Sequence, residues 1–226
     1  IEMVEMGDSK KKEKKLEKRV EKEEKKEKGV LEETIFEAVK SRLPILLVLL
    51  LLQSSASVIL EHYEVFLDNH TVMEVFMTVL LGAGGNAGGQ SAATILQVGS
   101  VGHLHLSEGS KFLIREGAIG LALGLFLGVI GLFRCWMNFS LYDSMVVGAV
   151  LFVIVTVSTV VGTAIPLICT FVYNYITKTF DKGTADAFHP ATTTFPILQV
   201  AMDIIGVIIL IAVASFIYAV GEMYSD

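Results

Sequence analysis

Asp203 is a lone acid within an apolar segment of the chain. A carboxylate at membrane depth costs on the order of 2.5–3.5 kcal/mol to insert, so such a residue usually pairs, binds an ion or relays a proton. No Lys or Arg lies in the apolar interior of any segment to pair with it. An ion or a proton is therefore the expected partner, and the alternative is a protonated Asp203 hydrogen-bonded to a neighbouring helix.

A glycine-rich run from Gly82 to Ser91 lies in another apolar segment. Glycines leave backbone carbonyls bare, and hard cations such as Mg²⁺ take oxygen ligands, one or two carboxylates and retained waters. Close helix packing explains the run equally well, since small residues recur at four-residue spacing. The pore-lining candidates are Gly85, Asn86, Gly89, Gln90 and Thr94 in this segment, with Thr193 and Gln199 before Asp203; packing hydroxyls are the alternative role for the threonines.

Membrane-spanning helices are the elements expected to position these residues. The 226 residues are 53% hydrophobic with a mean hydropathy of +0.62, and several apolar runs reach roughly 18 residues, the length that crosses a bilayer. We predict an all-α membrane protein whose transmembrane domain, residues 43–226, has five transmembrane helices. They are expected at about 43–60, 72–98, 112–137, 144–176 and 191–220.

Two local features refine this prediction. The first span opens at Arg42-Leu43-Pro44, where a proline suits the first turn of a helix. In the third span, glycines form a stripe that predicts a helix-packing face. The stripe comprises Gly117, Gly120, Gly124, Gly128 and Gly131.

The N-terminal region differs from the rest in composition. Between Lys10 and Lys28 it has eleven Lys or Arg and six Glu, so residues 1–29 are predicted to be a charged low-complexity tail that cannot fold alone. The interleaved Glu argues against nucleic-acid binding. Residues 30–42 space their apolar side chains as in an amphipathic helix, which we expect to lie on the membrane and lead into the first span.

The distribution of Lys and Arg predicts the orientation. The N-terminal region and the loops near 100–116 and 177–190 contain Lys or Arg. The loop near 61–71 and the C-terminus contain Asp or Glu but no Lys or Arg. The N-terminus is therefore expected inside and the C-terminus outside. Because one carboxylate per chain is a poor cage for a divalent ion, a symmetric dimer with two Asp203 side chains around one axis is favoured. The pore is then expected at the homodimer interface.

Three motifs together resemble the transmembrane domain of MgtE-type magnesium channels. They are Arg42-Leu43-Pro44, the run Gly84-Gly85-Asn86-Ala87-Gly88-Gly89-Gln90-Ser91-Ala92 and the stretch 190–206, which ends in Thr…Asp-x-x-Gly. The resemblance covers about residues 35–220. It implies a homodimeric Mg²⁺ channel with a pore formed by the second and fifth helices. It also implies that Asp203 and its dimer mate bind hydrated Mg²⁺ and that Asn86 lies near the inner pore.

The chain departs from that family's pattern at several points. The family often has Asn at the position of Gly89 and Asp at that of His189, and bacterial members have cytosolic sensor domains for which the N-terminal region is too short. We therefore expect either a truncated chain, or gating by another mechanism or by a separate regulatory domain or subunit.

The expected function is a homodimeric divalent-cation channel or transporter in a lipid bilayer, with Mg²⁺ as the ion bound and transported. The alternatives are an Mn²⁺ or broad divalent-cation transporter, a proton-coupled exchanger, and a non-conducting membrane scaffold subunit. No enzymatic activity, organic cofactor or nucleic-acid partner is expected; an intramembrane aspartyl protease would need a second intramembrane Asp. The expected location is the plasma membrane, with an organelle membrane as the alternative.

Overall fold

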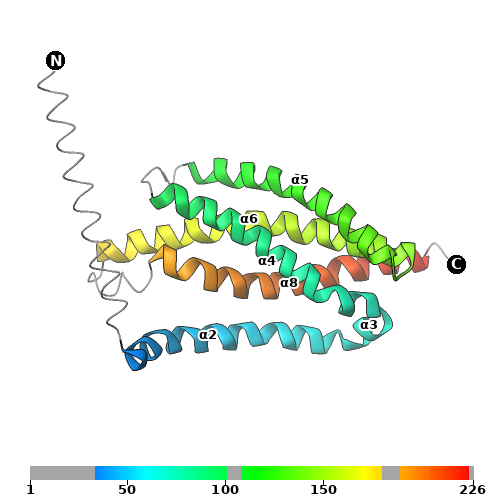
Figure 1. The fold of residues 1–226 in the computed structure, drawn as a ribbon, viewed down its shortest axis with the longest axis horizontal. Helices are drawn as coiled ribbons and strands as arrows, with labels where there is room; N and C mark the ends of the chain where they lie inside the picture. Colours follow the sequence, from blue (N-terminus) through cyan, green and yellow to red (C-terminus); the bar gives the residue numbers. More distant parts are fainter. Residues whose placement is uncertain (1–33, 101–107, 180–188, 224–226) are drawn as a thin grey trace, which may run out of the picture. The chain divides into compact units, whose positions relative to one another are not determined.

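The structure is a computed structural model that describes residues 34–100, 108–179 and 189–223. All regular structure in these ranges is α-helical (Figure 1), which confirms the predicted all-α class. The predicted tail, residues 1–29, lies outside the described residues. The helices are α2 (Ile35–His62), α3 (Glu64–Asn69), α4 (Thr71–Ser100), α5 (Gly109–Trp136), α6 (Leu141–Thr179) and α8 (Pro190–Met223).

Four of these helices, α2, α5, α6 and α8, are long and apolar enough to cross a membrane. α4 has 30 residues, as many as a span needs. However, α4, which contains the glycine run with Asn86 and Gln90, is not among the helices that meet both the length and the composition criteria. Length therefore agrees with the predicted five spans, whereas composition supports four in the described part of the chain.

The start of α2 is fixed by a hydrogen-bonded cap. The Thr34 amide donates to Glu37 Oε2 at 3.1 Å, and the Glu37 amide donates to Thr34 Oγ1 at 3.4 Å, as in a capping box. Pro44 consequently lies inside the helix, and the expectation that it occupies the first turn is wrong. Residues 35–42 and the first predicted span form one continuous helix.

The chain divides into two units, residues 1–48 and 49–226. Within the second unit, α6 is the central helix and packs against α4, α5 and α8. The fully buried side chains of this core come from these helices and include Met73, Leu80, Ile154, Val155 and Leu210. α3, the turn between α5 and α6, and the C-terminal end of α8 lie at one end of this unit (Figure 1).

The glycine stripe of α5 is a packing face, as predicted. A Cβ atom at Gly128 would lie 2.8 Å from the Gly148 carbonyl oxygen of α6, and one at Gly124 would lie 2.7 Å from the Phe152 carbonyl oxygen. The Thr156 hydroxyl also lies 3.3 Å from the Gly120 carbonyl oxygen, to which it donates. Small residues therefore let the two backbones meet.

α4 crosses α6 with a similarly close contact. A Cβ atom at Gly162 would overlap the carbonyl group of Gly88, and one at Gly88 would lie 2.8 Å from the Ser158 carbonyl oxygen. One turn earlier, a Cβ at Gly84 would meet Ile154 Cγ2 at 2.6 Å. Gly84 and Gly88 are thus the packing pair of the glycine run.

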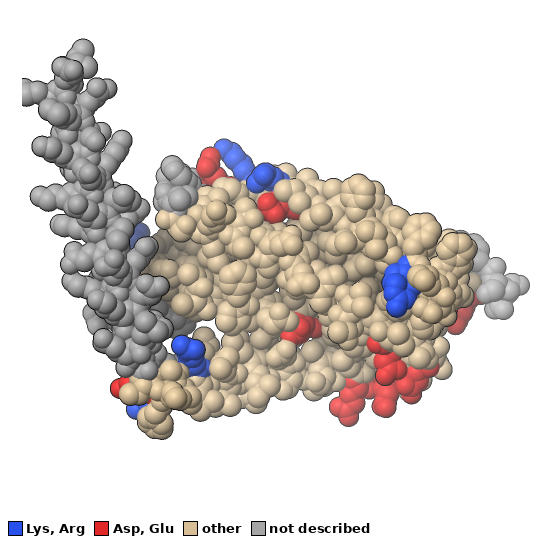
Figure 2. All heavy atoms as spheres, viewed as in Figure 1, with Lys and Arg blue, Asp and Glu red and all other residues tan. Residues whose placement is uncertain are grey.

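Polar contacts join the helices at the end that contains α3. The Tyr218 hydroxyl donates to Asp143 Oδ1 at 2.7 Å, and the His70 ring stacks on Tyr218 with centroids 3.7 Å apart. Figure 2 shows a patch of acidic side chains over α3. The exposed carboxylates in and beside α3 are Glu61, Glu64, Asp68 and Glu74.

We expect Gly162→Ala to lower the free energy of unfolding by about 1–3 kcal/mol, the usual cost of overpacking, because the new methyl group would meet the Gly88 carbonyl. Equilibrium unfolding of the purified protein in detergent measures this change.

Gly82→Ala is the matched control, because no heavy atom lies within 4 Å of its added Cβ. It should be neutral or stabilising by up to about 1 kcal/mol, the helix propensity of alanine over glycine. Equal stability of the two variants would contradict the close α4–α6 contact.

Candidate functional site

The Asp203 carboxylate lies half-buried on α8 and accepts two hydrogen bonds from side-chain amides. Gln199 Nε2 donates to Oδ1 at 3.0 Å from one turn earlier on the same helix. Gln53 Nε2, on α2, donates to Oδ2. In the part of the chain that the structure describes, the recorded ion pairs of Lys and Arg do not involve Asp203. The carboxylate is held by neutral donors, which satisfy an ionised group without cancelling its charge.

Gln199 links this carboxylate to the glycine run of α4. A Cβ atom at Gly85 would lie 3.7 Å from Gln199 Oε1, an ordinary van der Waals contact. The amide nitrogen of Gln199 therefore faces Asp203, while its oxygen faces Gly85. Because Gly85 has no side chain, the Gln199 oxygen remains accessible beside the α4 backbone.

The two glycine pairs of α4 have different surroundings. Gly84 and Gly88 are buried against α6, whereas Gly85 and Gly89 are half-exposed. No heavy atom lies within 4 Å of a Cβ built at Gly89, and the Asn86 side chain is exposed. The run is therefore a packing surface on one side of α4 and an open, polar surface on another.

The remaining pore-lining candidates do not join this cluster. Gln90 and Thr94 line a cavity of about 230 Å³ between α4 and α5, and the Thr94 hydroxyl donates to the Gln90 carbonyl at 3.0 Å. Thr193 is buried, donates to the His189 carbonyl at 3.1 Å, and lines a largely apolar cavity of about 320 Å³ with residues of α6. The structure brings together Gly85, Gln199 and Asp203, but not these three.

Sequence reasoning missed two polar residues that the structure places in interhelical contacts. Gln53 is an amide in the first apolar helix, and the same argument that singled out Asp203 applies to it. Glu116 is buried in α5 and accepts a hydrogen bond from the Ser91 hydroxyl of α4 at 2.8 Å. Glu116 follows Arg115 near the start of a predicted span. The distribution of Lys and Arg places Arg115 in a loop, so the neighbouring Glu116 is also read as a loop residue.

A complete protein cage for a metal ion is not present among residues 34–100, 108–179 and 189–223. No three His, Cys, Asp or Glu side chains lie together there. Asp203 remains the predicted metal-binding residue, and one carboxylate suits an ion that is bound through its own waters. This is the mode that Mg²⁺ favours, because it dehydrates reluctantly.

Comparison with known proteins identifies the family of the chain. The model of the MgtE divalent cation transporter family matches residues 77–213, which include the glycine run and Asp203. The chain is similar to the magnesium transporter MgtE of Thermus thermophilus, with 28% identity over 169 residues, or 75% of this chain and 34% of that protein. It is also similar to the magnesium transporter MgtE of Enterococcus faecalis, with 27% identity over 191 residues, which are 81% of this chain and 38% of that protein. The chain thus spans little more than a third of the length of these relatives.

We expect a double-mutant cycle to detect the bond between Gln53 and Asp203. Gln53→Ala and Asp203→Ala should be non-additive by about 0.5–3 kcal/mol in the free energy of unfolding, the range for residues in contact. Equilibrium unfolding of the two single variants and the double variant in detergent measures this coupling.

Gln97→Ala provides the control, because Gln97 is an exposed glutamine near the C-terminal end of α4. Combined with Asp203→Ala, it should be additive within about 0.5 kcal/mol. Additivity of the Gln53 pair to the same extent would show that the two residues do not interact.

Proposed function

The chain belongs to the MgtE family of divalent cation transporters, and from that premise we propose that it conducts Mg²⁺ across a membrane as a homodimer. In this proposal the two Asp203 side chains lie on either side of the dimer axis and bind the hydrated ion. The two relatives are named as magnesium transporters, which supports Mg²⁺ as the ion. Because this chain covers only part of their length, its activity is a proposal.

The observation that carries the proposal is the position of polar groups on apolar helices. Gln53, Asn86 and Gln199 are exposed in the single chain, although they occur in long apolar segments. Lipid offers amide groups no hydrogen-bond partners, so such groups are tolerated only beside protein or a water-filled cavity. The surface that includes Asp203 therefore requires water or a second copy of the chain, and a pore at a dimer interface provides both.

The amide environment of Asp203 suits a transported ion. A Lys or Arg partner would cancel the charge that attracts a cation, whereas Gln53 and Gln199 donate hydrogen bonds without doing so. An arriving hydrated ion offers water protons as alternative donors to the carboxylate. The ion therefore binds without full dehydration and leaves without breaking direct metal–carboxylate bonds, which conduction requires.

The second and fifth long helices supply different parts of the proposed pore. α8 contributes the Asp203 charge and the Gln199 oxygen, and α4 contributes Asn86 and the accessible backbone near Gly85 and Gly89. We propose the plasma membrane as the location. Gln90, Thr94 and Thr193 remain predicted pore-lining residues, although their recorded contacts lie toward α5 or within α8 and α6.

We expect Asp203→Asn to reduce Mg²⁺ flux by about tenfold or more while the dimer still assembles. Loss of a charge-assisted interaction worth about 1.5–3 kcal/mol corresponds to at least about tenfold in affinity. Flux is measured in liposomes containing a Mg²⁺-sensitive dye, and assembly by size-exclusion chromatography with light scattering.

Asp68→Asn makes the same chemical change at an exposed position on α3 and should conduct like the unmodified protein. Unchanged flux in Asp203→Asn would remove the pore-carboxylate role. Flux that requires a proton gradient would favour the exchanger, and equal or greater flux of Mn²⁺ would favour the broader transporter. A well-folded unmodified chain without flux would favour the scaffold.

A further inference from the structure

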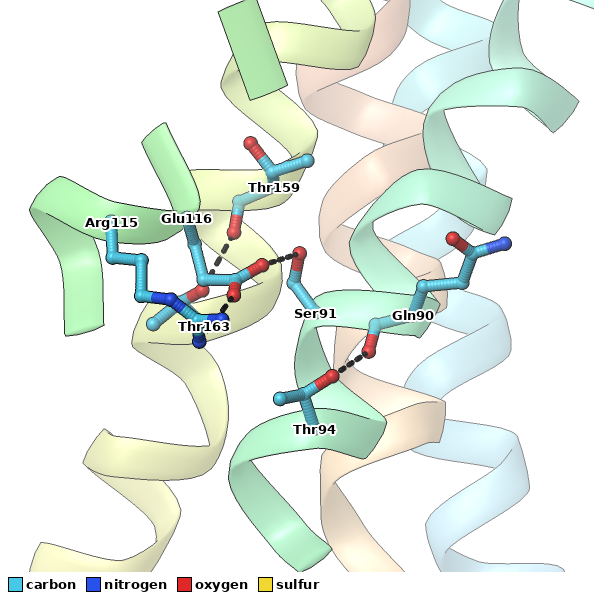
Figure 3. A network of polar contacts seen from close by, with 7 residues as sticks. All are labelled: Gln90, Ser91, Thr94, Arg115, Glu116, Thr159 and Thr163. Atoms are coloured by element: carbon cyan, nitrogen blue, oxygen red, sulfur yellow. Dashed lines mark hydrogen bonds and ion pairs between the residues drawn. The ribbon is translucent and has the colours of Figure 1, made fainter. Parts of the chain in front are cut away.

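Glu116 is a buried acid outside the Asp203 cluster. Glu116 is 6% exposed and lies on α5, one of the helices apolar enough to cross a membrane. The Ser91 hydroxyl of α4 donates to Glu116 Oε2 at 2.8 Å (Figure 3). The structure therefore contains a buried hydrogen bond between α4 and α5.

The neighbouring Arg115 compensates this charge only weakly. Its Nη1 atom lies 3.8 Å from Glu116 Oε1, and its side chain is 66% exposed against 8% for that of Glu116. Because the distance is long and the Arg115 side chain lies largely in solvent, this pair contributes little. Burying a carboxylate is costly, and an apolar side chain packs at such a place at least as well. Packing alone therefore does not explain an acid at this position.

The hydrogen bond from Ser91 to Glu116 holds α4, the helix on which the glycine run has its open surface. Ser91 points toward Glu116, whereas the side chain of the adjacent Gln90 extends away from it (Figure 3), although Gln90 also lines the cavity between α4 and α5. Gly84 and Gly88, on the packing side with Ser91, are buried, and Asn86 is exposed. Rotation of α4 about its axis would move Asn86 and Gln90 relative to Asp203.

Between Leu80 and Ile95 the buried residues of α4 are all small, so packing determines the rotation of this stretch less well than it does at the large buried side chains on either side. Gly84 and Gly88 bring α4 close to α6, but residues without side chains do not interlock with a neighbouring helix as larger side chains do. A buried polar contact has a defined direction and can specify register where apolar contacts cannot. The bond from Ser91 to Glu116 meets this need at the end of the glycine run.

We propose that Glu116 is a positioning residue that fixes the rotation of α4 through Ser91, so that Asn86 and the accessible backbone near Gly85 face the path of the ion. The inference rests on the proposed function, because the ion path is part of it. Glu116 acts as a hydrogen-bond acceptor and does not itself touch the ion.

Three variants separate this role from others. Glu116→Gln keeps an acceptor oxygen and the side-chain length but removes the charge, and should conduct with the selectivity of the unmodified protein. Glu116→Leu removes the acceptor, and Ser91→Ala removes the donor. Both should change the ratio of Ca²⁺ to Mg²⁺ flux by roughly twofold to thirtyfold, the range for residues that act on a site without contacting its ligand. The ratio is measured per folded dimer in dye-loaded liposomes.

Ser158→Ala is the matched control for Ser91→Ala. Ser158 is also buried beside the glycine run, but its hydroxyl donates within its own helix, to the Ile154 carbonyl at 2.6 Å. Its replacement should leave the flux ratio unchanged. A merely structural role for Glu116 would lower the yield of folded dimer in Glu116→Leu without changing the ratio, and would overturn the proposal.

An equal loss of flux in Glu116→Gln and Glu116→Leu would also overturn the proposal, because the charge of Glu116 would then matter. A cation bound in the cavity lined by Glu116 would explain that result better. Asp203→Asn is measured in the same liposomes. If it conducts normally, the proposed function fails; if it does not conduct while Glu116→Leu and Ser91→Ala keep the normal ratio, only the role of Glu116 fails.

Discussion

The close approach of α4 to α6 is the constraint on which the rest of the helical arrangement depends. At Gly88 and Gly162 the two backbones meet so closely that a single added methyl group has no room. A membrane offers little hydrophobic force between helices, so close van der Waals contact of small residues must hold them together. This contact fixes how near α4 lies to the centre of the fold, and α5 and α8 pack against the same central helix.

That constraint divides the glycine run into two surfaces with different surroundings. Gly84 and Gly88 are used for packing, which leaves Gly85 and Gly89 toward the open side of α4. Gly85 lies beside the Gln199 side chain, whose amide donates to the Asp203 carboxylate. Packing and the proposed permeation are therefore not alternatives for this run. They involve adjacent residues on different sides of one helix.

Three acids of the fold accept hydrogen bonds from uncharged donors. Asp203 accepts from two glutamine amides, Glu116 from a serine hydroxyl, and Asp143 from a tyrosine hydroxyl. Each bond reduces the cost of a buried or half-buried acid. Each acid also joins two helices, since the donor to Asp203 from another helix is Gln53 of α2, the donor to Glu116 is Ser91 of α4, and the donor to Asp143 is Tyr218 of α8.

The sequence by itself determined the helical class, the long apolar segments and the packing role of the α5 stripe, and it singled out Asp203 as a candidate site residue, because these follow from local composition and spacing. It left the two roles of the glycine run undecided and gave no reason to pair Gln53 or Glu116 with any partner. Residues 53 and 203, or 91 and 116, lie far apart along the chain, and no local pattern encodes the rotation of one helix against another. Only the tertiary structure decided which side of α4 is buried, because that depends on where the α6 backbone passes.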